Sequence, residues 1–276
     1  MQTQILGYPR IGANRELKKA CENYWAGKIE LQALLQTSRT ITKQNWALQQ
    51  AAGIDLIPCN DFSFYDQVLD FTLSVGAIPA RFNTVALNKK NTELDLYFAM
   101  ARGYQKDNLD ITAMEMTKWF DTNYHYIVPE FVKNQEFKYF SNSIVNEFIA
   151  AKKEGFNPKT VLIGPITYLL LGKEKEEGFD RIDLIQNLLP VYFEIIHDLI
   201  NHGANTIQFD EPFLALDLDE KSKTAYQEVY KKIRKEFPQL TIQVATYFDG
   251  LKDNTALAIN LPIDILHLDL VRDENQ

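Results

Sequence analysis

Two adjacent acidic residues followed by a proline give the clearest chemical signal in this sequence. Asp210, Glu211 and Pro212 come directly after residues 206–209, which we predict to form a strand. Neighbouring carboxylates at a strand end can act as general acid and base, or hold the amino group of a ligand. They can also serve as structural caps, and the residue types alone leave both roles open.

Basic residues indicate a second kind of chemistry, the binding of an anion. Arg10, Arg15 and Lys18 lie around the start of a predicted helix, whose N-terminus already carries partial positive charge. This arrangement is unfavourable unless an anion binds there, although a solvated basic face would explain it as well. Lys118 stands beside Trp119; it can bind a carboxylate next to the ring, or be an ordinary surface lysine.

The cysteines and histidines do not form a recognisable metal-binding motif. Cys21 falls on the apolar face of a predicted helix and Cys59 closes an apolar run, so we expect both to be reduced core residues. A pair made of Cys59 and His267 would supply too few ligands for a stable zinc site. The sequence therefore predicts no metal in this chain. The other histidines are His125, His197 and His202.

Composition argues against several classes of protein. The chain has 276 residues, is 46% hydrophobic and carries a net charge of −8, whereas a general nucleic-acid binder would be basic. Its longest apolar stretches, such as residues 168–171, are too short to span a bilayer. Residues 1–4 lack the start of a signal peptide. We therefore expect a cytoplasmic globular protein that binds neither nucleic acid nor membrane.

The chain alternates short apolar runs with helical patterns. Connections between the runs are too long for hairpins, which predicts parallel strands joined by helices. Residues 67–114 are less regular, and we expect a loop around residues 76–88 and a helix at 94–103. The predicted strands lie near residues 5, 55, 161, 207, 242 and 265. The predicted helices are one capped by Asn14 and those at 28–53, 94–103, 143–153, 183–202 and 221–237.

A barrel explains this alternation better than a dinucleotide-binding sheet, because no glycine-rich fingerprint follows any of the strands. A closed (βα)8 barrel has eight strands. The prediction is therefore an α/β fold of the (βα)8 TIM type, incomplete in this chain, with about six of the eight βα units. Polar residues follow the strands where barrels build their sites, although strand ends that meet solvent are polar too. These residues are Arg10, Asn60, Asp61, Thr167, Asp210, Glu211, Thr246, Asp249 and Asp269.

Three segments resemble a known family. Residues 7–28, GYPRIGANRELKKACENYWAGK, are similar to the opening of cobalamin-independent methionine synthase, the 5-methyltetrahydropteroyltriglutamate–homocysteine methyltransferase. Residues 115–131, EMTKWFDTNYHYIVPEF, and 206–217, TIQFDEPFLALD, extend the resemblance. It runs along the whole chain but covers only the N-terminal part of that longer, two-halved enzyme. The resemblance also implies a (βα)8 barrel for this half.

The resemblance implies a set of ligand-binding residues. In the family, an Arg-Glu-Leu-Lys segment and the lysine of the second motif are folate-binding positions. The carboxylates of a polyglutamyl folate tail would suit such cations chemically. The matching residues here are Arg15, Glu16, Leu17, Lys18 and Lys118.

The resemblance also implies where the reaction chemistry lies. A motif similar to Asp210-Glu211-Pro212 helps to hold the amino-acid substrate in the catalytic half, and here it looks like a non-catalytic counterpart. We therefore expect a structural or capping role for Asp210 and Glu211. The family's zinc is held by cysteine, histidine and glutamate in the C-terminal half, so no metal and no catalytic residue are expected in this chain.

These observations lead to one main reading and two alternatives. We expect residues 1–276 to be a truncated N-terminal barrel domain, without the catalytic C-terminal barrel. The whole enzyme would transfer a methyl group from 5-methyltetrahydropteroyltri-L-glutamate to L-homocysteine, and this fragment alone would be inactive. One alternative is a stand-alone, non-catalytic binding or scaffold module with a degenerate barrel. The other is a compact hydrolase that uses Asp210 and Glu211.

Overall fold

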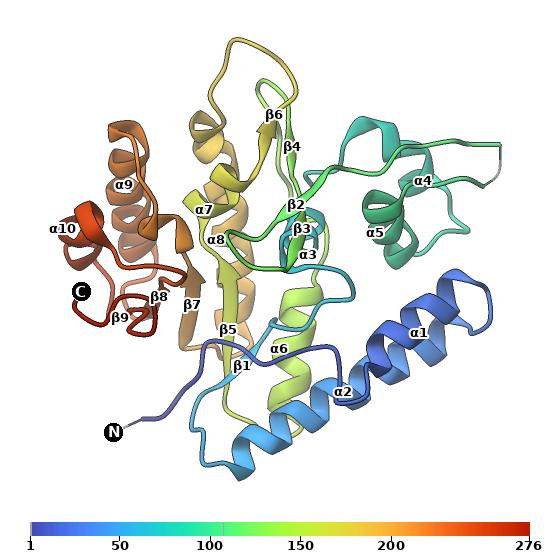
Figure 1. Ribbon diagram of the computed structural model, residues 1–276, viewed down its shortest axis with the longest axis horizontal. Helices are drawn as coiled ribbons and strands as arrows, with labels where there is room; N and C mark the ends of the chain where they lie inside the picture. Colours follow the sequence, from blue (N-terminus) through green and yellow to red (C-terminus); the bar gives the residue numbers. More distant parts are fainter. Residues whose placement is uncertain (1, 107) are drawn as a thin grey trace.

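A five-stranded parallel sheet forms the centre of the chain in the computed structural model, which describes residues 2–106 and 108–276. Its strands lie side by side in chain order, and each pairing is parallel (Figure 1). The predicted parallel α/β arrangement is therefore confirmed. The strands are β1 (Ile57–Cys59), β5 (Pro158–Ile163), β7 (Thr206–Asp210), β8 (Thr241–Ala245) and β9 (Ile265–His267).

An isolated bridge forms where a strand was predicted near residue 5. Gln4 forms one isolated parallel bridge with the residue that precedes β1. The carbonyls of Ile5 and Leu6 accept hydrogen bonds from Lys159 Nζ and Gln208 Nε2, each at 3.1 Å. Both side chains belong to strands of the central sheet. Their hydrogen bonds occupy the carbonyls of Ile5 and Leu6, which a further strand would need for pairing.

Helices connect the strands and pack around the sheet. The helices predicted at 94–103, 143–153, 183–202 and 221–237 agree with the observed ones to within two residues, because regular apolar spacing defines them. Helix α8 packs against α6, α7 and α9, and buries most of its apolar side chains. The corresponding helices are α5 (Glu93–Arg102), α6 (Ser143–Lys153), α8 (Ile185–Asn201) and α9 (Glu220–Glu236), and α7 (Pro165–Leu171) is a further helix that was not predicted.

The loop predicted around residues 76–88 is partly helical, so residues 67–114 hold more helix than expected. This segment contains α3 (Gln67–Ser74) and α4 (Asn83–Leu87) before α5. Asp66 caps α3, because its Oδ1 accepts hydrogen bonds from the backbone N–H groups of Val68 and Leu69, each at 2.9 Å. An acidic N-cap before an apolar run is a helix signal that glycine and asparagine residues further along the segment obscured.

Two helices near the N-terminus, α1 (Glu16–Trp25) and α2 (Leu31–Ala51), pack together beside the sheet (Figure 1). Most of their buried apolar residues belong to a second hydrophobic cluster, separate from that of the sheet, whereas Trp46 of α2 packs in the cluster of the sheet. Asn14 does not cap α1, contrary to the prediction. Arg15 takes the cap position with a left-handed backbone (φ 60°), and the Glu16 carboxylate reaches back to accept the Asn14 N–H at 2.9 Å.

Two small sheets lie outside the central one. Strands β2 (Met116–Lys118) and β3 (His125–Ile127) form an antiparallel hairpin, and β4 (Glu130–Phe131) pairs with β6 (Lys173–Glu174). Both cysteines are buried and neither forms a disulfide, as expected for reduced core residues. The hairpin lies at the carboxyl end of the sheet, where it joins the loops that follow the strands.

Candidate functional site

The carboxyl ends of the parallel strands meet at one edge of the sheet, but several polar residues predicted there bind the protein itself. Asn60 Nδ2 donates a hydrogen bond to the carbonyl of Val161 at 2.8 Å. The Thr246 hydroxyl donates to the carbonyl of His267, also at 2.8 Å. Asp269 accepts hydrogen bonds from the backbone N–H of Phe248 in the loop after β8, and from two N–H groups of its own loop. These side chains fix the loops in place.

Glu211 is completely buried and caps a helix. Its Oε2 accepts hydrogen bonds from the N–H of Thr167 (2.9 Å) and the hydroxyl of Tyr226 (3.0 Å), and its Oε1 accepts one from the hydroxyl of Tyr230 (3.0 Å). Thr167 lies in the first turn of α7, where backbone N–H groups lack helical partners. Burial raises the pKa of Glu211 to about 7. A Cβ at Gly164 would lie 2.0 Å from the carboxyl carbon, so this position needs glycine.

Asp210 belongs to a buried polar network that includes a residue missed by the sequence analysis. Its two oxygens accept hydrogen bonds from Gln208 Nε2 (2.7 Å) and the Tyr247 hydroxyl (2.9 Å). Lys159 lies on β5 and donates from Nζ to the side-chain oxygens of Gln208 and Gln4, each at 2.7 Å. Burial lowers the pKa of Lys159 to about 8. The signal that could have revealed Lys159 in the sequence is a single charged residue within a predicted buried strand.

The four consecutive residues predicted to bind folate begin α1 and have different environments. Arg15 and Lys18 are exposed, and Lys18 Nζ lies 3.6 Å from Glu22 Oε1 across one helical turn. Leu17 is buried at 1% exposure and anchors the helix to the second hydrophobic cluster. Hydrogen bonds from backbone N–H groups lower the pKa of Glu16, so its carboxylate is ionised at neutral pH.

Lys118 lies on a different element from the other predicted cations. It is the last residue of β2, is exposed, and pairs with His125 across the hairpin. Figure 1 shows the hairpin above β5 and α1 to one side of the sheet. Trp119, the neighbour of Lys118, turns inward and is buried. The structure therefore presents Arg15 and Lys18 on one element and Lys118 on another.

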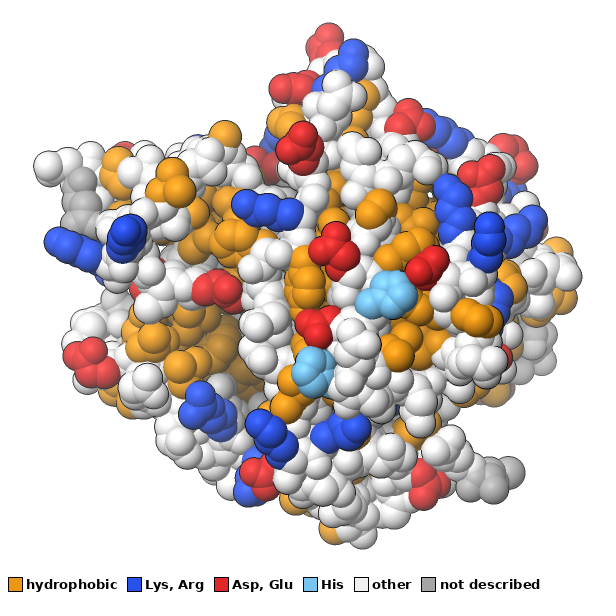
Figure 2. Space-filling model, turned by 180° about the vertical axis from the view of Figure 1, so that it is seen from behind, with side chains coloured by type: hydrophobic (Ala, Val, Ile, Leu, Met, Phe, Trp, Pro, Cys, Tyr) orange, Lys and Arg blue, Asp and Glu red, His pale blue; other side chains and the backbone are white. Residues whose placement is uncertain are grey.

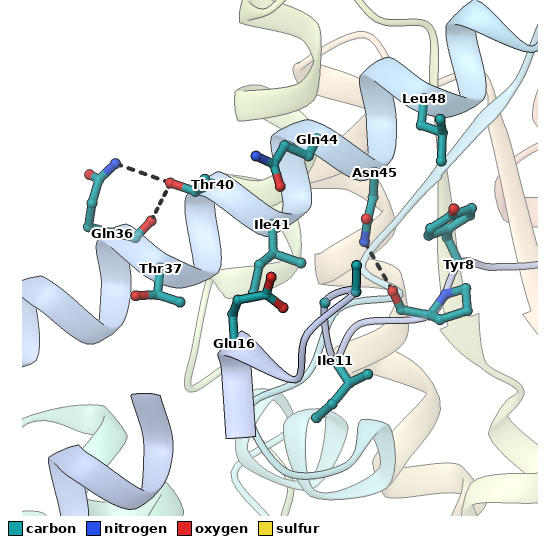
Figure 3. A pocket seen from close by; sticks show the side chains of 13 residues that line it. Tyr8, Ile11, Glu16, Gln36, Thr37, Thr40, Ile41, Gln44, Asn45 and Leu48 are labelled. Carbon is teal, nitrogen blue, oxygen red and sulfur yellow. Dashed lines mark hydrogen bonds between the residues drawn. The ribbon is translucent and has the colours of Figure 1, made fainter. Parts of the chain in front are cut away.

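A hollow of about 660 Å³ separates the loop before α1 from α2, and we call it the α2 hollow (Figure 3). Tyr8, Ile11 and Glu16 face it from the loop and the start of α1, and Ile41 and Leu48 face it from α2. A hydrogen bond from Asn45 Nδ2 to the carbonyl of Pro9 (3.1 Å) joins its two walls. Glu16 is the member of the predicted folate-binding set that lines it.

A second hollow, of about 670 Å³, lies between the loop at residues 8–11 and the β2–β3 hairpin, and we call it the hairpin hollow. Several aromatic side chains line it, and its polar lining includes Asp61, which follows β1. Residues 8–11 line both hollows, so the N-terminal loop joins them. Sequence reasoning noted the aromatic residues of 112–131 without recognising that they form a wall.

On the part of the surface that Figure 2 shows, basic residues occur at separate positions. On the face seen in Figure 2, basic and acidic side chains are interspersed between apolar patches. Among residues 2–106 and 108–276, no group of three or more histidine, cysteine, aspartate or glutamate side chains is placed to hold a metal ion. None of the helices in the described part of the chain combines the length and apolar character needed to cross a membrane.

Comparison with known proteins decides the family. Residues 2–276 match the family model of the cobalamin-independent synthase, N-terminal domain. The chain belongs to this family. A 5-methyltetrahydropteroyltriglutamate–homocysteine methyltransferase of Flavobacterium johnsoniae is 62% identical over 272 residues, which are 99% of this chain and 35% of that protein. The same enzyme of Cytophaga hutchinsonii is 57% identical over 98% of this chain and 35% of its own length.

This member of the cobalamin-independent synthase family thus spans about a third of the length of the curated relatives that it matches. Solved structures support the fold. A putative vitamin-B12 independent methionine synthase from Listeria monocytogenes aligns over 100% of this chain and 78% of its own, with a TM-score of 0.61 at 14% identity. A B12-independent methionine synthase from Shewanella, solved with selenomethionine, aligns over 85% of this chain and 59% of its own, with a TM-score of 0.53 at 19% identity.

Proposed function

We propose that this chain is the N-terminal, folate-tail-binding part of a methyltransferase. The whole enzyme moves a methyl group from 5-methyltetrahydropteroyltri-L-glutamate to L-homocysteine and makes methionine in the cytoplasm. The observation that carries the proposal is the match of residues 2–276 to the N-terminal domain of the family, together with relatives of that name at 62% and 57% identity. The chain alone is then inactive, because it holds only part of the enzyme.

The binding surface for the tail consists of Arg15, Lys18 and Lys118. All three are exposed, as cations must be to meet a ligand that carries several carboxylates. Leu17 anchors α1, and Glu16 holds the loop before it through the Asn14 N–H. In this proposal Glu16 and Leu17 position the two cations of α1, while the cations themselves contact the tail.

The sheet represents an arc of a (βα)8 barrel. In doubly wound sheets the strand order reverses at a switch point. Here the order β1-β5-β7-β8-β9 follows the chain without reversal, and the bridge at Gln4 extends it at the β1 edge. We therefore propose that residues 1–276 are most of an N-terminal barrel, whose last strands and catalytic partner barrel belong to the whole protein.

We assign the zinc of the whole enzyme to its catalytic C-terminal half. The thiol of Cys59 is buried, with Sγ 3.6 Å from the Thr160 hydroxyl, and His267 Nδ1 lies 3.0 Å from the Thr246 carbonyl. These side chains are engaged with the protein and do not form a set of ligands. No step of the reaction is therefore attributed to a metal held by this chain.

One observation favours a non-catalytic binding or scaffold module as the second candidate. Asp210 and Glu211, the sharpest candidates for acid and base, are both buried and hydrogen-bonded to the protein. The same contacts argue against a compact hydrolase that uses these residues. If such an activity were present, replacing Glu211 by Gln should abolish it.

A titration with folates of different tail length tests the proposal. We expect this chain to bind 5-methyltetrahydropteroyltriglutamate at least about tenfold more tightly than the monoglutamate, because one charge-assisted contact contributes about 1.5–3 kcal/mol. Lys118→Ala and the double variant Arg15→Ala/Lys18→Ala should each reduce this preference, and added salt should weaken it.

Lys153→Ala is the matched control for these variants, because Lys153 is an exposed lysine at the end of α6, on another element. This variant should bind both folates as the unmodified chain does. Equal affinity for the two tail lengths in the unmodified chain would overturn the assignment of the tail-binding surface and favour the scaffold module.

A further inference from the structure

A third hollow, of about 350 Å³, lies between helices α2, α3 and α5, and we call it the three-helix hollow. Its volume falls within the range of small-molecule sites. Figure 2 shows apolar side chains gathered in a recess on the side of the molecule that carries α2 and α5. Each helix lines the hollow with two side chains about one turn apart, which lie on the same face of a helix. These pairs are Leu31 and Leu35 of α2, Asp70 and Leu73 of α3, and Leu94 and Tyr97 of α5.

The walls of the three-helix hollow are held in place by hydrogen bonds around it. The hydroxyl of Tyr97 accepts the N–H of Tyr65 at 2.9 Å, which joins α5 to the loop before α3. The hydroxyl of Tyr24 in α1 donates to Asp95 Oδ1 in α5 at 2.8 Å, and α1 packs against α2. These contacts fix the three helices relative to one another, so a ligand would enter a space that is already formed.

The interior of the hollow presents apolar surface that is still accessible. Four of its apolar side chains are only partly buried, and the ring of Phe64 is oriented by an edge-to-face contact with Phe62, with centroids 5.4 Å apart. Covering such surface removes apolar area from water, which is favourable. The ligand should therefore have an apolar body. The four partly buried side chains are Leu31, Leu35, Phe64 and Leu94.

The charged side chains that line the hollow are both acidic. They are Asp70, within it, and Glu93, an exposed residue at the start of α5. Asp70 Oδ2 accepts the hydroxyl of Ser63, and Glu93 Oε1 accepts the hydroxyl of Ser141 at 2.6 Å. In the described part of the chain, no lysine, arginine or histidine lines this hollow. The charge of the hollow is therefore complementary to a cation.

Asp70 is ionised at slightly alkaline pH. Burial raises its pKa to about 6, while the charge of Arg10 acts in the opposite direction. The guanidinium of Arg10 itself donates to the carbonyl of Tyr65. At pH 7.5 the carboxylate of Asp70 can thus accept hydrogen bonds from a ligand.

We propose that the three-helix hollow binds a small primary amine with an apolar body. Its ammonium group donates to the carboxylates of Asp70 and Glu93, and its body packs on Leu35, Phe64 and Leu94. Hydrogen bonds between an ammonium group and a carboxylate are among the stronger ones in proteins. Among the described residues, this hollow shares no lining residue with the α2 hollow or the hairpin hollow, and it includes none of the proposed folate-binding residues. The proposal is therefore independent of the proposed function.

Two probes with the same body test the proposal directly. 2-Phenylethylamine carries an ammonium group at pH 7.5, as a lysine side chain does, and 2-phenylethanol carries a hydroxyl in its place. We expect the amine to bind the whole 276-residue chain saturably at millimolar concentration, as measured by ligand-observed saturation-transfer NMR. The alcohol should bind at least about tenfold more weakly, because it lacks the charge-assisted contacts. Added salt should weaken binding of the amine.

Two variants assign the ammonium group to the carboxylates. Glu93→Gln keeps an acceptor for the hydroxyl of Ser141, and Asp70→Asn keeps one for the hydroxyl of Ser63. Each should weaken binding of the amine about tenfold and leave binding of the alcohol unchanged. Glu136→Gln is the control, because Glu136 is exposed and lies outside the hollow, and it should change neither.

A third variant assigns the apolar body to the hollow. Leu35→Trp fills the space from α2 and should abolish binding of both probes. Leu87→Trp, at a leucine of α4 that is 81% exposed and outside the hollow, is its control. Circular dichroism should show that each variant is folded. If Asp70→Asn is not, Glu93→Gln and Leu35→Trp decide the matter.

Three results would overturn the proposal. The first is the absence of saturable amine binding at millimolar concentration. The second is equal affinity for the amine and the alcohol, which would show that the carboxylates do not contribute. The third concerns the backbone amide signals of the protein in the presence of the amine. Shifts at residues 31–35 and 92–97 are expected, whereas shifts confined to residues 119–126 would place the amine in the hairpin hollow instead.

Discussion

At the scale of single residues, Glu211 shows how a motif that resembles an acid–base pair can serve packing instead. Its carboxylate receives one backbone N–H and two tyrosine hydroxyls inside the protein. The sequence predicted a strand end and a capping role, and both agree with the structure. The hydrogen-bond partners were not predicted. Tyr226 and Tyr230 belong to α9, and their position beside Glu211 depends on tertiary packing.

Replacing Glu211 by Leu should destabilise the protein strongly. The change leaves the Thr167 N–H and the two tyrosine hydroxyls without an acceptor, and each unsatisfied buried group costs about 1–3 kcal/mol. We expect a fall of at least about 3 kcal/mol in the free energy of unfolding, measured by urea denaturation. Glu211→Gln, which keeps one acceptor oxygen, should lose less. A Leu variant as stable as the unmodified chain would contradict the capping role.

At the scale of elements, the N-terminal segment depends on side chains from the sheet. Lys159 Nζ holds the side chain of Gln4 and the carbonyl of Ile5, and Gln208 holds the carbonyl of Leu6. Apolar residues at positions 5 and 6 suggested a strand, but hydrogen bonds from the buried side chain of Lys159 take the place of strand pairing. Local pattern predicted the long helices well, whereas this segment depended on contacts between residues more than 150 positions apart.

Replacing Lys159 by Met should release this segment. Methionine keeps the length of the side chain but removes the donors, so the oxygens of Gln4 and Ile5 lose their partner. We expect hydrogen exchange at residues 4–8 to accelerate, and the free energy of unfolding to fall by about 1–3 kcal/mol. Lys152→Met, on the exposed surface of α6, is the control. Unchanged exchange at residues 4–8 in Lys159→Met would show that the segment is held by other means.

At the scale of the whole molecule, buried carboxyl groups couple stability to pH. Burial raises the pKa of six such groups far above the value near 4 that aspartate and glutamate have in an unfolded chain. Between the unfolded and folded values, the folded state therefore binds more protons. The folded pKa values are about 6 for Asp70 and Asp210, about 7 for Asp61, Asp66 and Glu211, and about 8 for Glu147.

The sign of the effect follows from this difference in bound protons. The stabilisation is present in full below about pH 4 and is lost as the pH rises through the folded values, so the free energy of unfolding should be lower at pH 8 than at pH 5. Lys159, whose pKa is lowered to about 8, acts in the opposite direction only above that pH. Urea denaturation at pH 5, 6.5 and 8 measures the slope.

Glu147→Gln should flatten this slope, because the amide keeps an acceptor for the Asn60 N–H but does not titrate. Glu228→Gln, at an exposed position of α9, should leave it unchanged. Stability that rises between pH 5 and 8 would show that these carboxyls are not desolvated in the folded protein.

The most direct test of the proposed function is the mass of the native protein that carries this segment in its source cells. An antibody raised against residues 2–276 and used on a cell extract would measure it. If the chain works as the N-terminal part of a methyltransferase, the band should lie far above the 31.9 kDa of this chain. A single band at 31.9 kDa would contradict that claim and make the chain a free-standing module.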